Sequence, residues 1–337
     1  MIKNNFFSIP KLKSIIIFGY HNKLNKLVKI IEKHQIDYCI ISSSDQSKNI
    51  KKINYRVFDR INAECKKFIV KNFDIEKTLF VSLGSRIIFS EKIIKKFLKN
   101  NLVNFHNSRL PLDAGGGSMS WRILRNDRID NQLVHLVDKG IDTGPIIYSK
   151  NSLFPHNCVI PQEMEEYSTK LFISFFEAFI KEIKLGKKFL LKNQSNYLGR
   201  YNPRLNTNIN GWIDWNMSSE NLIRFINAFD DPYPGALTSI NKKIVRIKKA
   251  QLHDGDSINH PFMSGLISRH DKDWLVVSTA DKSMILIEKV LNKKNKNIIS
   301  DLKQGDRFVT SLSKLYLARK DRIKYNSRGL ISKANKK

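Results

Sequence analysis

The chain has 337 residues, 41% of them hydrophobic, so it can bury a core large enough for two ordinary domains, and a disordered chain is excluded. Its formal net charge of +28 favours a nucleic acid, an anionic membrane or a phosphorylated ligand as partner. Lys, Asn and Ile are frequent along the whole chain, as in proteins from AT-rich genes, so charge spread over solvated surfaces is the alternative explanation.

The apolar run nearest the N-terminus, Ile15 to Phe18, is far too short for the core of a signal peptide, and no stretch has the length of a membrane span. The three cysteines, Cys39, Cys65 and Cys158, form no CxxC pair and have no spacing suited to zinc or to a disulfide framework. We therefore expect a cytoplasmic protein with neither a bound metal nor a membrane partner.

Short apolar runs alternate with helical patterns in the first third of the chain. Residues 22–33 and 91–100 each place four apolar side chains on one helical face. The runs predicted to be strands are residues 14–19, 37–43, 78–84 and 102–107. This alternation predicts an α/β fold with a Rossmann-like, mostly parallel sheet and flanking helices, in which ligands bind at the carboxyl ends of the strands.

The pattern changes after residue 130, where predicted strands at 132–138 and 145–150 flank a glycine-containing loop. A long helix is expected from Pro161 to about Ile183, and the Lys-rich residues 181–194 are expected to form a linker. The first, catalytic domain would then occupy residues 1–190.

A second domain is predicted for residues 191–300, as a small β-rich, OB-like barrel. It contains one helix, Ser218 to Phe229, followed by five short strands separated by turn signals. The strands are expected at residues 236–240, 243–250, 265–270, 274–280 and 284–290. Residues 301–337 are predicted to be a basic, mobile or partner-binding tail, because residues 313–337 contain nine Lys or Arg against Asp321 alone.

Asn104 and His106 are the first candidates for catalysis. They lie two residues apart at the end of a predicted strand, so their side chains share one face while Phe105 points into the opposite layer. On spacing alone, an ordinary strand-terminal turn with a hydrogen-bonded Asn and His explains the pair more simply. The neighbouring segments distinguish a catalytic pair from an ordinary strand-terminal turn.

Two of these segments resemble the folate-dependent formyltransferases, which include methionyl-tRNA, glycinamide ribonucleotide and sugar-nucleotide formyltransferases. Residues 104–111, NFHNSRLP, are similar to the family's N-x-H-x-S-L-L-P segment. Residues 137–147, VDKGIDTGPII, are similar to its V-D-x-G-x-D-T-G-x-I-I segment. In the second domain, GWIDW at 211–215 and AFDDPYPGA at 228–236 resemble the segments that open the family's C-terminal domain, so the resemblance covers most of residues 13–293.

The resemblance implies an enzyme that transfers a formyl group from the co-substrate 10-formyltetrahydrofolate to a primary amine. Asn104, with His106 beside it, would stabilise the negative charge that develops on the formyl oxygen. Asp142 would orient His106, raise its proton affinity, and accept the ammonium proton directly or through water.

The resemblance also implies contacts with both substrates. The residues implied for folate binding are Leu83, Gly84, Ile88, Asp138 and Gly140, and those implied for the acceptor are Ser108 and Trp121. For Ile88, ordinary packing in the core is the alternative.

The chain departs from the family's pattern beside the catalytic loop. Ser118 stands where the family usually has Pro, and Ala114 where it commonly has Arg. Residues 130–133, DNQL, replace the expected T-G-V-T. The three catalytic candidates are intact, so these departures indicate an unusual acceptor.

Two acceptors fit the sequence. Trp121 matches a tryptophan of many sugar N-formyltransferases and favours a nucleotide-linked amino sugar, as in cell-surface polysaccharide biosynthesis. The second domain, the Lys-rich stretch and the basic tail support initiator tRNA instead. A single-domain purine enzyme fits less well, and a non-catalytic basic RNA-binding or sugar-binding protein is opposed by the intact candidates. The sequence leaves open whether the chain forms a homodimer.

Overall fold

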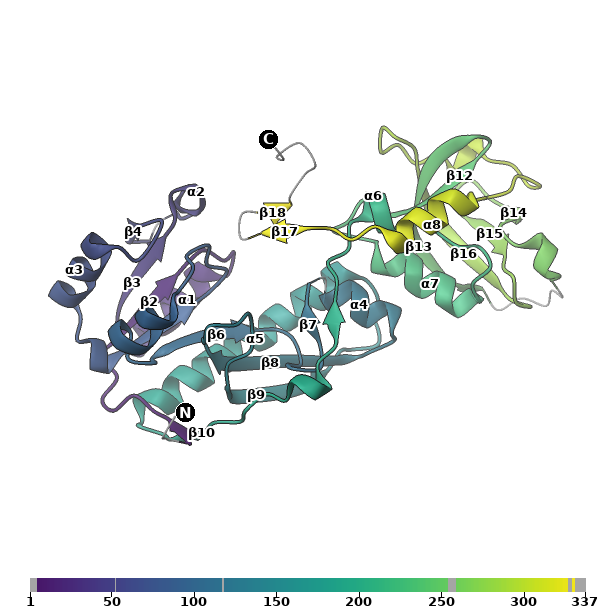
Figure 1. The fold of residues 1–337 in the computed structure, drawn as a ribbon. Helices are drawn as coiled ribbons and strands as arrows, with labels where there is room; N and C mark the ends of the chain where they lie inside the picture. The colour runs from purple at the N-terminus through teal and green to yellow at the C-terminus, as the bar shows by residue number, and fades with distance from the viewer. Residues whose placement is uncertain (1–4, 52, 117, 254–258, 327–328, 331–337) are drawn as a thin grey trace.

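The computed structural model describes the chain except residues 1–4, 52, 117, 254–258, 327–328 and 331–337. Figure 1 shows an α/β part, which contains both a large sheet and the long helix α5, and a β-rich part at the opposite end. Within the described residues, no helix combines the length and the apolar character needed to cross a membrane.

The first part is built on a seven-stranded sheet in the order β4-β3-β2-β5-β6-β8-β9. Its strands are β2 (Ser14–Phe18), β3 (Asp37–Ser42), β4 (Tyr55–Val57), β5 (Thr78–Ser82), β6 (Leu102–His106), β8 (Ile129–Leu136) and β9 (Ile146–Leu153). The first five are mutually parallel, whereas β8 runs antiparallel to β6 and β9 antiparallel to β8. The predicted mostly parallel α/β sheet is therefore confirmed. The short edge strand β4 was not expected, because it lacks a buried apolar run.

Helices cover both faces of this sheet, as predicted. On one face, α1 (Leu24–Lys33) and α5 (Pro161–Lys184) pack on Ile15 and Ile17. On the other face, α3 (Ala63–Asn72) and a π-helical turn, η2 (Ile93–Phe97), pack on Ile16 and Phe18. These four strand residues are fully buried because successive side chains of β2 alternate between two covered faces.

The start of α5 follows from local sequence signals. Pro161 occupies the first turn, where its missing N–H costs nothing. The Glu163 carboxylate accepts hydrogen bonds from the backbone N–H groups of Val159 and Ile160, at 2.8 and 3.2 Å. The predicted long helix is confirmed.

The linker expected at residues 181–194 is wrong. The helix α5 continues to Lys184, and β10 (Phe189–Leu190) then pairs with β1 (Phe6–Phe7). Lys192 forms an isolated bridge with Ile146. Buried aromatic packing of Phe189 outweighs the polar composition of this stretch, and the domain boundary near residue 190 stays a prediction.

The second part contains α7 (Ser219–Ala228) and a five-stranded antiparallel sheet, as predicted. Its strand order is β12 (Ala236–Ile240), β13 (Lys243–His253), β16 (Met284–Leu291), β15 (Leu275–Ser278) and β14 (Ile267–His270). Bridges from Ser239 to Val309 and from Leu266 to Arg307 connect both edges of the sheet through residues 307–309. This short segment closes the sheet into a small barrel.

Part of the expected basic tail is folded onto the second domain. The helix α8 (Leu312–Lys320) places Arg319 Nη2 2.7 Å from Asp214 Oδ2, and Lys314 Nζ 3.9 Å from the ring centre of Trp212. Two basic groups of the predicted tail are therefore paired within the chain, and the tail as a partner-binding segment stays a prediction. Residues 327–328 and 331–337 of the predicted tail lie outside the described residues.

The two parts share a hydrophobic core. Met119 on α4 (Ser118–Leu124) and Met164 on α5 belong to the same buried cluster as Leu222 and Ile226 on α7. Ser120 Oγ donates to the carbonyl of Ala228 at 2.8 Å. The remaining short elements are α2 (Ser44–Ser47), η1 (Ile75–Lys77), β7 (Ala114–Gly115), η3 (Asn196–Leu198), β11 (Tyr201–Asn202), α6 (Thr207–Asn210), η4 (Pro261–Met263), η5 (Ile299–Asp301), β17 (Tyr325–Asn326) and β18 (Gly329–Leu330).

Candidate active site

The catalytic candidates on β6 lie at the carboxyl end of the parallel strands. Phe105 packs against four phenylalanines of α5, with ring centres 5.1 to 6.2 Å away. Asn104 and His106, one residue to either side, therefore face away from α5. Their side chains therefore lie on the same face of β6, as the two-residue spacing predicted.

A histidine that the sequence analysis did not single out completes this cluster. His135 on β8 lies directly opposite Asn104 in the antiparallel pair, so the two side chains share a face. Asn104 Nδ2 is 3.2 Å from His135 Nε2, and His135 Nδ1 is 2.8 Å from the carbonyl oxygen of Leu136. Because that oxygen can only accept, Nδ1 carries the hydrogen and Nε2 of the neutral ring accepts from Asn104.

Asp142 joins the cluster through His135. Its Oδ1 lies 3.6 Å from His135 Nε2, and the contact becomes an ion pair only when the His135 ring is protonated. Burial would raise the pKa of Asp142, but the hydrogen bond with His135 and the charges of His106 and His135 lower it below its usual value. Asp142 is therefore a carboxylate at neutral pH. The structure brings Asp142 to His135, whereas the resemblance implied that Asp142 orients His106.

His106 is held in its neutral form. Burial lowers its pKa most, the nearby Asp142 carboxylate opposes this, and the charges of His135 and Arg122 lower it further. Its ring centre lies 6.3 Å from that of His135. A neutral imidazole beside a donor amide can accept a proton at physiological pH.

The loop that carries Asp142 is strained and tightly held. Asp142 adopts a φ of +56°, in the left-handed region that non-glycine residues rarely occupy. Gln194 Nε2 donates to the carbonyl of Asp142 at 2.8 Å. Asp138 Oδ1 accepts from Gly140 N at 3.0 Å and from Thr143 Oγ1 at 2.6 Å. These contacts fix the loop before any ligand arrives.

The residues implied for folate binding fall into two groups. Asp138 and Gly140 lie in the Asp142 loop, and Ile88 is 80% exposed, which contradicts packing in the core and leaves its side chain accessible. Leu83 and Gly84 instead line a cavity that also contains Phe105, on the α5 side of the sheet. Folate contacts by these five residues stay predictions.

The two residues implied for the acceptor already have partners within the chain. The Ser108 hydroxyl donates to the carbonyl of Asp113, and the side chain is buried. Trp121 Nε1 donates to the carbonyl of Pro203 at 2.8 Å. Both residues hold the loops around the site in place, and their contact with a substrate stays a prediction.

Two cavities share Glu165 of α5 as a wall, and the cluster of Asn104, His106, His135 and Asp142 lines neither of them. The smaller one has a volume of about 200 Å³ and is lined by Phe105, Asn107, Gln132 and Glu165, with His21, Lys23, Leu83, Gly84 and Phe172. The larger one, about 470 Å³, lies between residues of both domains, including Met119, Arg204 and Tyr233. Among the described residues, no group of three or more His, Cys, Asp or Glu side chains is placed to hold a metal ion.

Charged groups line the smaller cavity. Lys23 Nζ lies 2.8 Å from Glu165 Oε1. His21 Nδ1 accepts from the backbone N–H of Lys23 at 3.2 Å. Burial first, and then the Lys23 charge, lower the pKa of His21 to about 4, against an opposing effect of Glu165. His21 is therefore neutral at physiological pH, with Nε2–H as its donor.

Comparison with known proteins identifies the fold and the chemistry. Residues 207–307 match the formyl transferase C-terminal domain family. A methionyl-tRNA formyltransferase of Clostridium perfringens (strain 13 / Type A) is 27% identical over 226 residues, which are 66% of this chain and 68% of that protein.

Two solved structures share the fold. WlaRD, a sugar 3N-formyl transferase in the presence of dTDP and 5-N-formyl-THF, has a TM-score of 0.60 and 20% identity, covering 84% of this chain and 100% of that chain. The N-formyltransferase of Helicobacter canadensis in complex with folinic acid and dTDP-3-aminofucose also has a TM-score of 0.60 and 20% identity, covering 82% and 99%.

The matched C-terminal domain, the curated relative and the shared fold agree with the resemblance of the sequence to formyltransferases. The chain is therefore a formyltransferase that contains the formyl transferase C-terminal domain, and it is similar to the folate-dependent formyltransferases.

Proposed function

We propose that the chain transfers the formyl group of 10-formyltetrahydrofolate to the primary amine of a nucleotide-linked amino sugar, with Asn104, His106 and Asp142 as catalytic residues. The observation that carries this proposal is the linked cluster of Asn104, His135 and Asp142 beside a neutral His106. It supplies a hydrogen-bond donor for an oxyanion and a base for a proton, which are the two groups that formyl transfer to an amine needs.

In the proposed reaction, the neutral amine attacks the formyl carbon, and a C–N bond forms while the carbonyl electron pair moves to oxygen. Asn104 donates one N–H to His135, and its second N–H stabilises the oxyanion. His106 takes a proton from the new ammonium nitrogen and returns it to N10 of the folate. The bond between the formyl carbon and N10 then breaks, leaving a formamide and tetrahydrofolate.

His135 and Asp142 act on the other members of the cluster. The hydrogen bond to His135 Nε2 fixes the rotamer of Asn104, so the donor is aimed before the substrate binds. The Asp142 carboxylate raises the pKa of His106 against the effect of burial, which makes His106 a better base. It also stabilises the imidazolium that forms during the reaction.

A nucleotide-linked sugar as acceptor is supported by the two cavities that share Glu165. A cavity of about 470 Å³ falls in the range of about 300–1,000 Å³ that small-molecule sites occupy, and the second cavity extends the space towards β6. The two structural neighbours described above are sugar or sugar-nucleotide N-formyltransferases. In addition, Arg319 and Lys314 of α8 are paired within the chain, which weakens the case for a tRNA-binding tail.

Initiator tRNA is the second candidate. It is favoured by the relative from Clostridium perfringens, a methionyl-tRNA formyltransferase, and by the net charge of +28. A polyanionic acceptor would bind in a strongly salt-dependent way.

The purified protein should be given 10-formyltetrahydrofolate and, separately, dTDP-3-aminofucose, dTDP-linked and UDP-linked 4-amino sugars, or methionylated initiator tRNA. We expect mass spectrometry to detect a formamide on at least one amino sugar, and none with the His106→Ala variant. If formyl is transferred to tRNA alone, initiator tRNA and not an amino sugar is the acceptor. The absence of transfer to any of these primary amines would overturn the proposal.

A further inference from the structure

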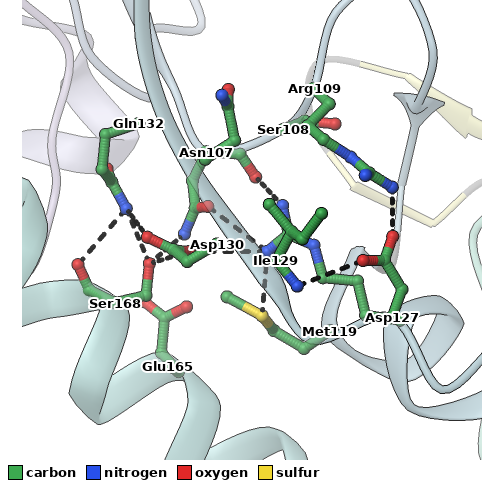
Figure 2. Close-up of polar contacts among 12 residues, drawn as sticks. Asn107, Ser108, Arg109, Met119, Asp127, Ile129, Asp130, Gln132, Glu165 and Ser168 are labelled. Carbon is green, nitrogen blue, oxygen red and sulfur yellow. Dashed lines mark hydrogen bonds and ion pairs between the residues drawn. The ribbon is translucent and has the colours of Figure 1, made fainter. Parts of the chain in front are cut away.

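A buried polar network lies behind the smaller cavity. We call it the polar wall: Asn107, Arg122, Asp130, Gln132 and Ser168. The side chains of Asp130, Gln132 and Ser168 converge between β8 and α5, as Figure 2 shows. Arg122 and Asp130 form an ion pair at 3.6 Å, and both side chains are only 1% exposed.

Gln132 has a defined orientation within this wall. Its Nε2 lies 2.7 Å from Asp130 Oδ2 and 2.8 Å from Ser168 Oγ. Because an ionised carboxylate only accepts hydrogen bonds, the amide nitrogen must face Asp130. The amide oxygen of Gln132 is therefore turned away from the wall.

That oxygen lacks a partner. Gln132 is 3% exposed, and its Oε1 is fully buried without a hydrogen-bond donor in the part of the chain that the structure describes. Buried amide oxygens are rarely left unpaired, because losing their hydrogen bonds to water is costly. Gln132 lines the smaller cavity, so a molecule bound there can supply the missing donor once the atoms that cover Oε1 shift aside.

The wall coincides with the segment where the chain departs from its family's pattern. Asp130 and Gln132 belong to residues 130–133, which replace T-G-V-T. Burying a carboxylate, a guanidinium and an amide together costs solvation that an apolar wall would avoid. Neither residue belongs to the Asn104, His135 and Asp142 cluster, so formyl transfer itself does not account for them.

The position of the cavity favours the acceptor over the folate, although Leu83 and Gly84, which the resemblance implied for folate binding, also line it. Phe105 and Asn107, the residues on either side of His106, both line it. It lies on the α5 side of the sheet, whereas His106 and the Asp142 loop lie at the opposite face. Two substrates approaching from opposite faces would meet at the end of β6.

We propose that the smaller cavity holds the sugar ring of the acceptor, and that Gln132 Oε1 selects it by accepting a hydrogen bond from a ring hydroxyl or amino group. The volume of about 200 Å³ is too small for a whole nucleotide-linked sugar and fits one part of it. Asp130 is a positioning residue that turns the Gln132 amide. This inference rests on the proposed function, because it assumes a sugar acceptor.

The first test uses the unaltered protein and varies the ligand. Binding of dTDP-3-aminofucose is measured by calorimetry and compared with analogues that each lack one ring hydroxyl. We expect one analogue to bind about 3- to 10-fold more weakly, the effect of losing one hydrogen bond to a neutral group. No binding of any of these sugars, or equal affinity for all of them, would overturn the inference.

The second test removes the acceptor atom. Gln132→Met keeps the length of the side chain, and we expect it to raise the KM for the amino sugar about 3- to 10-fold while leaving the KM for 10-formyltetrahydrofolate unchanged. The variant should no longer distinguish the sensitive analogue from the parent sugar. A higher KM for the folate, or retained discrimination, would contradict the assignment.

Asn131→Met is the matched control. Asn131 is the adjacent buried amide on β8, and it donates to Asn151 Oδ1 rather than lining the cavity. We expect it to lower stability without changing discrimination among the sugars. Asp130→Asn, which allows the Gln132 amide to turn over, should weaken discrimination without changing the KM for the folate.

The outcomes separate the two proposals. If the protein formylates an amino sugar but Gln132→Met keeps its discrimination, only the role of Gln132 fails. If it formylates tRNA and binds no nucleotide-linked sugar, both the sugar acceptor and this inference fail.

Discussion

At the scale of single residues, His106 is the group whose protonation state controls the proposed reaction. Burial lowers its pKa below 6.5, and the Asp142 carboxylate opposes that effect. We expect the ring protons of His106, followed by NMR and assigned with His106→Ala, to titrate below pH 6.5. The neutral, proton-accepting form then predominates at pH 7 and is lost as the pH falls through this pKa.

The same experiment tests the influence of Asp142. Asp142→Asn removes the negative charge that raises the pKa of His106, so the pKa should fall further in this variant. An unchanged or higher pKa in Asp142→Asn would contradict the electrostatic coupling.

Substitution of the proposed catalytic side chains should affect the reaction far more than the fold. His106→Ala and Asp142→Asn should each lower kcat/KM by about 10²- to 10⁴-fold, the usual contribution of a positioned acid or base. Circular dichroism should show an unchanged fold. His156→Ala, at an exposed histidine, is the control and should keep normal turnover. Normal turnover in either active-site variant would rule out the mechanism.

At the scale of elements, the loop between β8 and β9 determines where Asp142 lies. A Cβ at Gly144 would come within 1.8 Å of the carbonyl oxygen of Leu136, so glycine is required for this close approach. We expect Gly144→Ala to displace the loop and to lower kcat/KM about 100-fold, as a misplacement of about 1 Å can. Steady-state kinetics would measure this effect.

Gly186→Ala, just after α5, is a control for the change from Gly to Ala. Gly186 also has a positive φ, of +79°, but a Cβ there would meet no atom within 4 Å. Some loss of stability is expected from the backbone strain, without an effect on kcat/KM. Equal kinetic effects in both variants would argue against the loop explanation.

At the scale of the whole molecule, the shared core couples the two parts of the chain. Met164 on α5 is 2% exposed and packs in the cluster that contains Leu222 and Ile226 of α7. Met164→Ala should lower the free energy of unfolding by about 2–5 kcal/mol, the usual cost of truncating a buried side chain to Ala. Urea denaturation would measure it.

Because the two parts share this core, the stability lost in Met164→Ala should appear in both of them. Hydrogen exchange should accelerate in α7 and in the barrel strands β12 and β13, as well as in α5. An effect restricted to the first part would show that the two parts unfold independently. Val70→Ala, at a 60% exposed position on α3, should leave both parts unchanged.

The sequence by itself determined most strands of the large sheet, the long helix α5 and the common face of the catalytic pair. Strands β2, β3 and β5 were predictable because each contains a continuous apolar run that is covered on both faces. Helix α5 was predictable from its long amphipathic period and from Pro161 at its start. Asn104 and His106 share a face because side chains alternate along a strand, which needs no tertiary contact.

The tertiary structure decided which distant groups meet. His135 reaches Asn104 through the antiparallel register of β6 and β8, and no local pattern sets a register between strands joined by a long connection. The docking of α8 and the burial of Asp130 likewise depend on partners far along the chain, Asp214 in one case and Ser168 in the other. From composition alone, α8 was predicted to be part of a basic tail, and residues 130–133 were only a local difference from the family's pattern. The ion pair of α8 with Asp214 and the burial of Asp130 against Ser168 depend on the folded chain, so only the tertiary structure shows them.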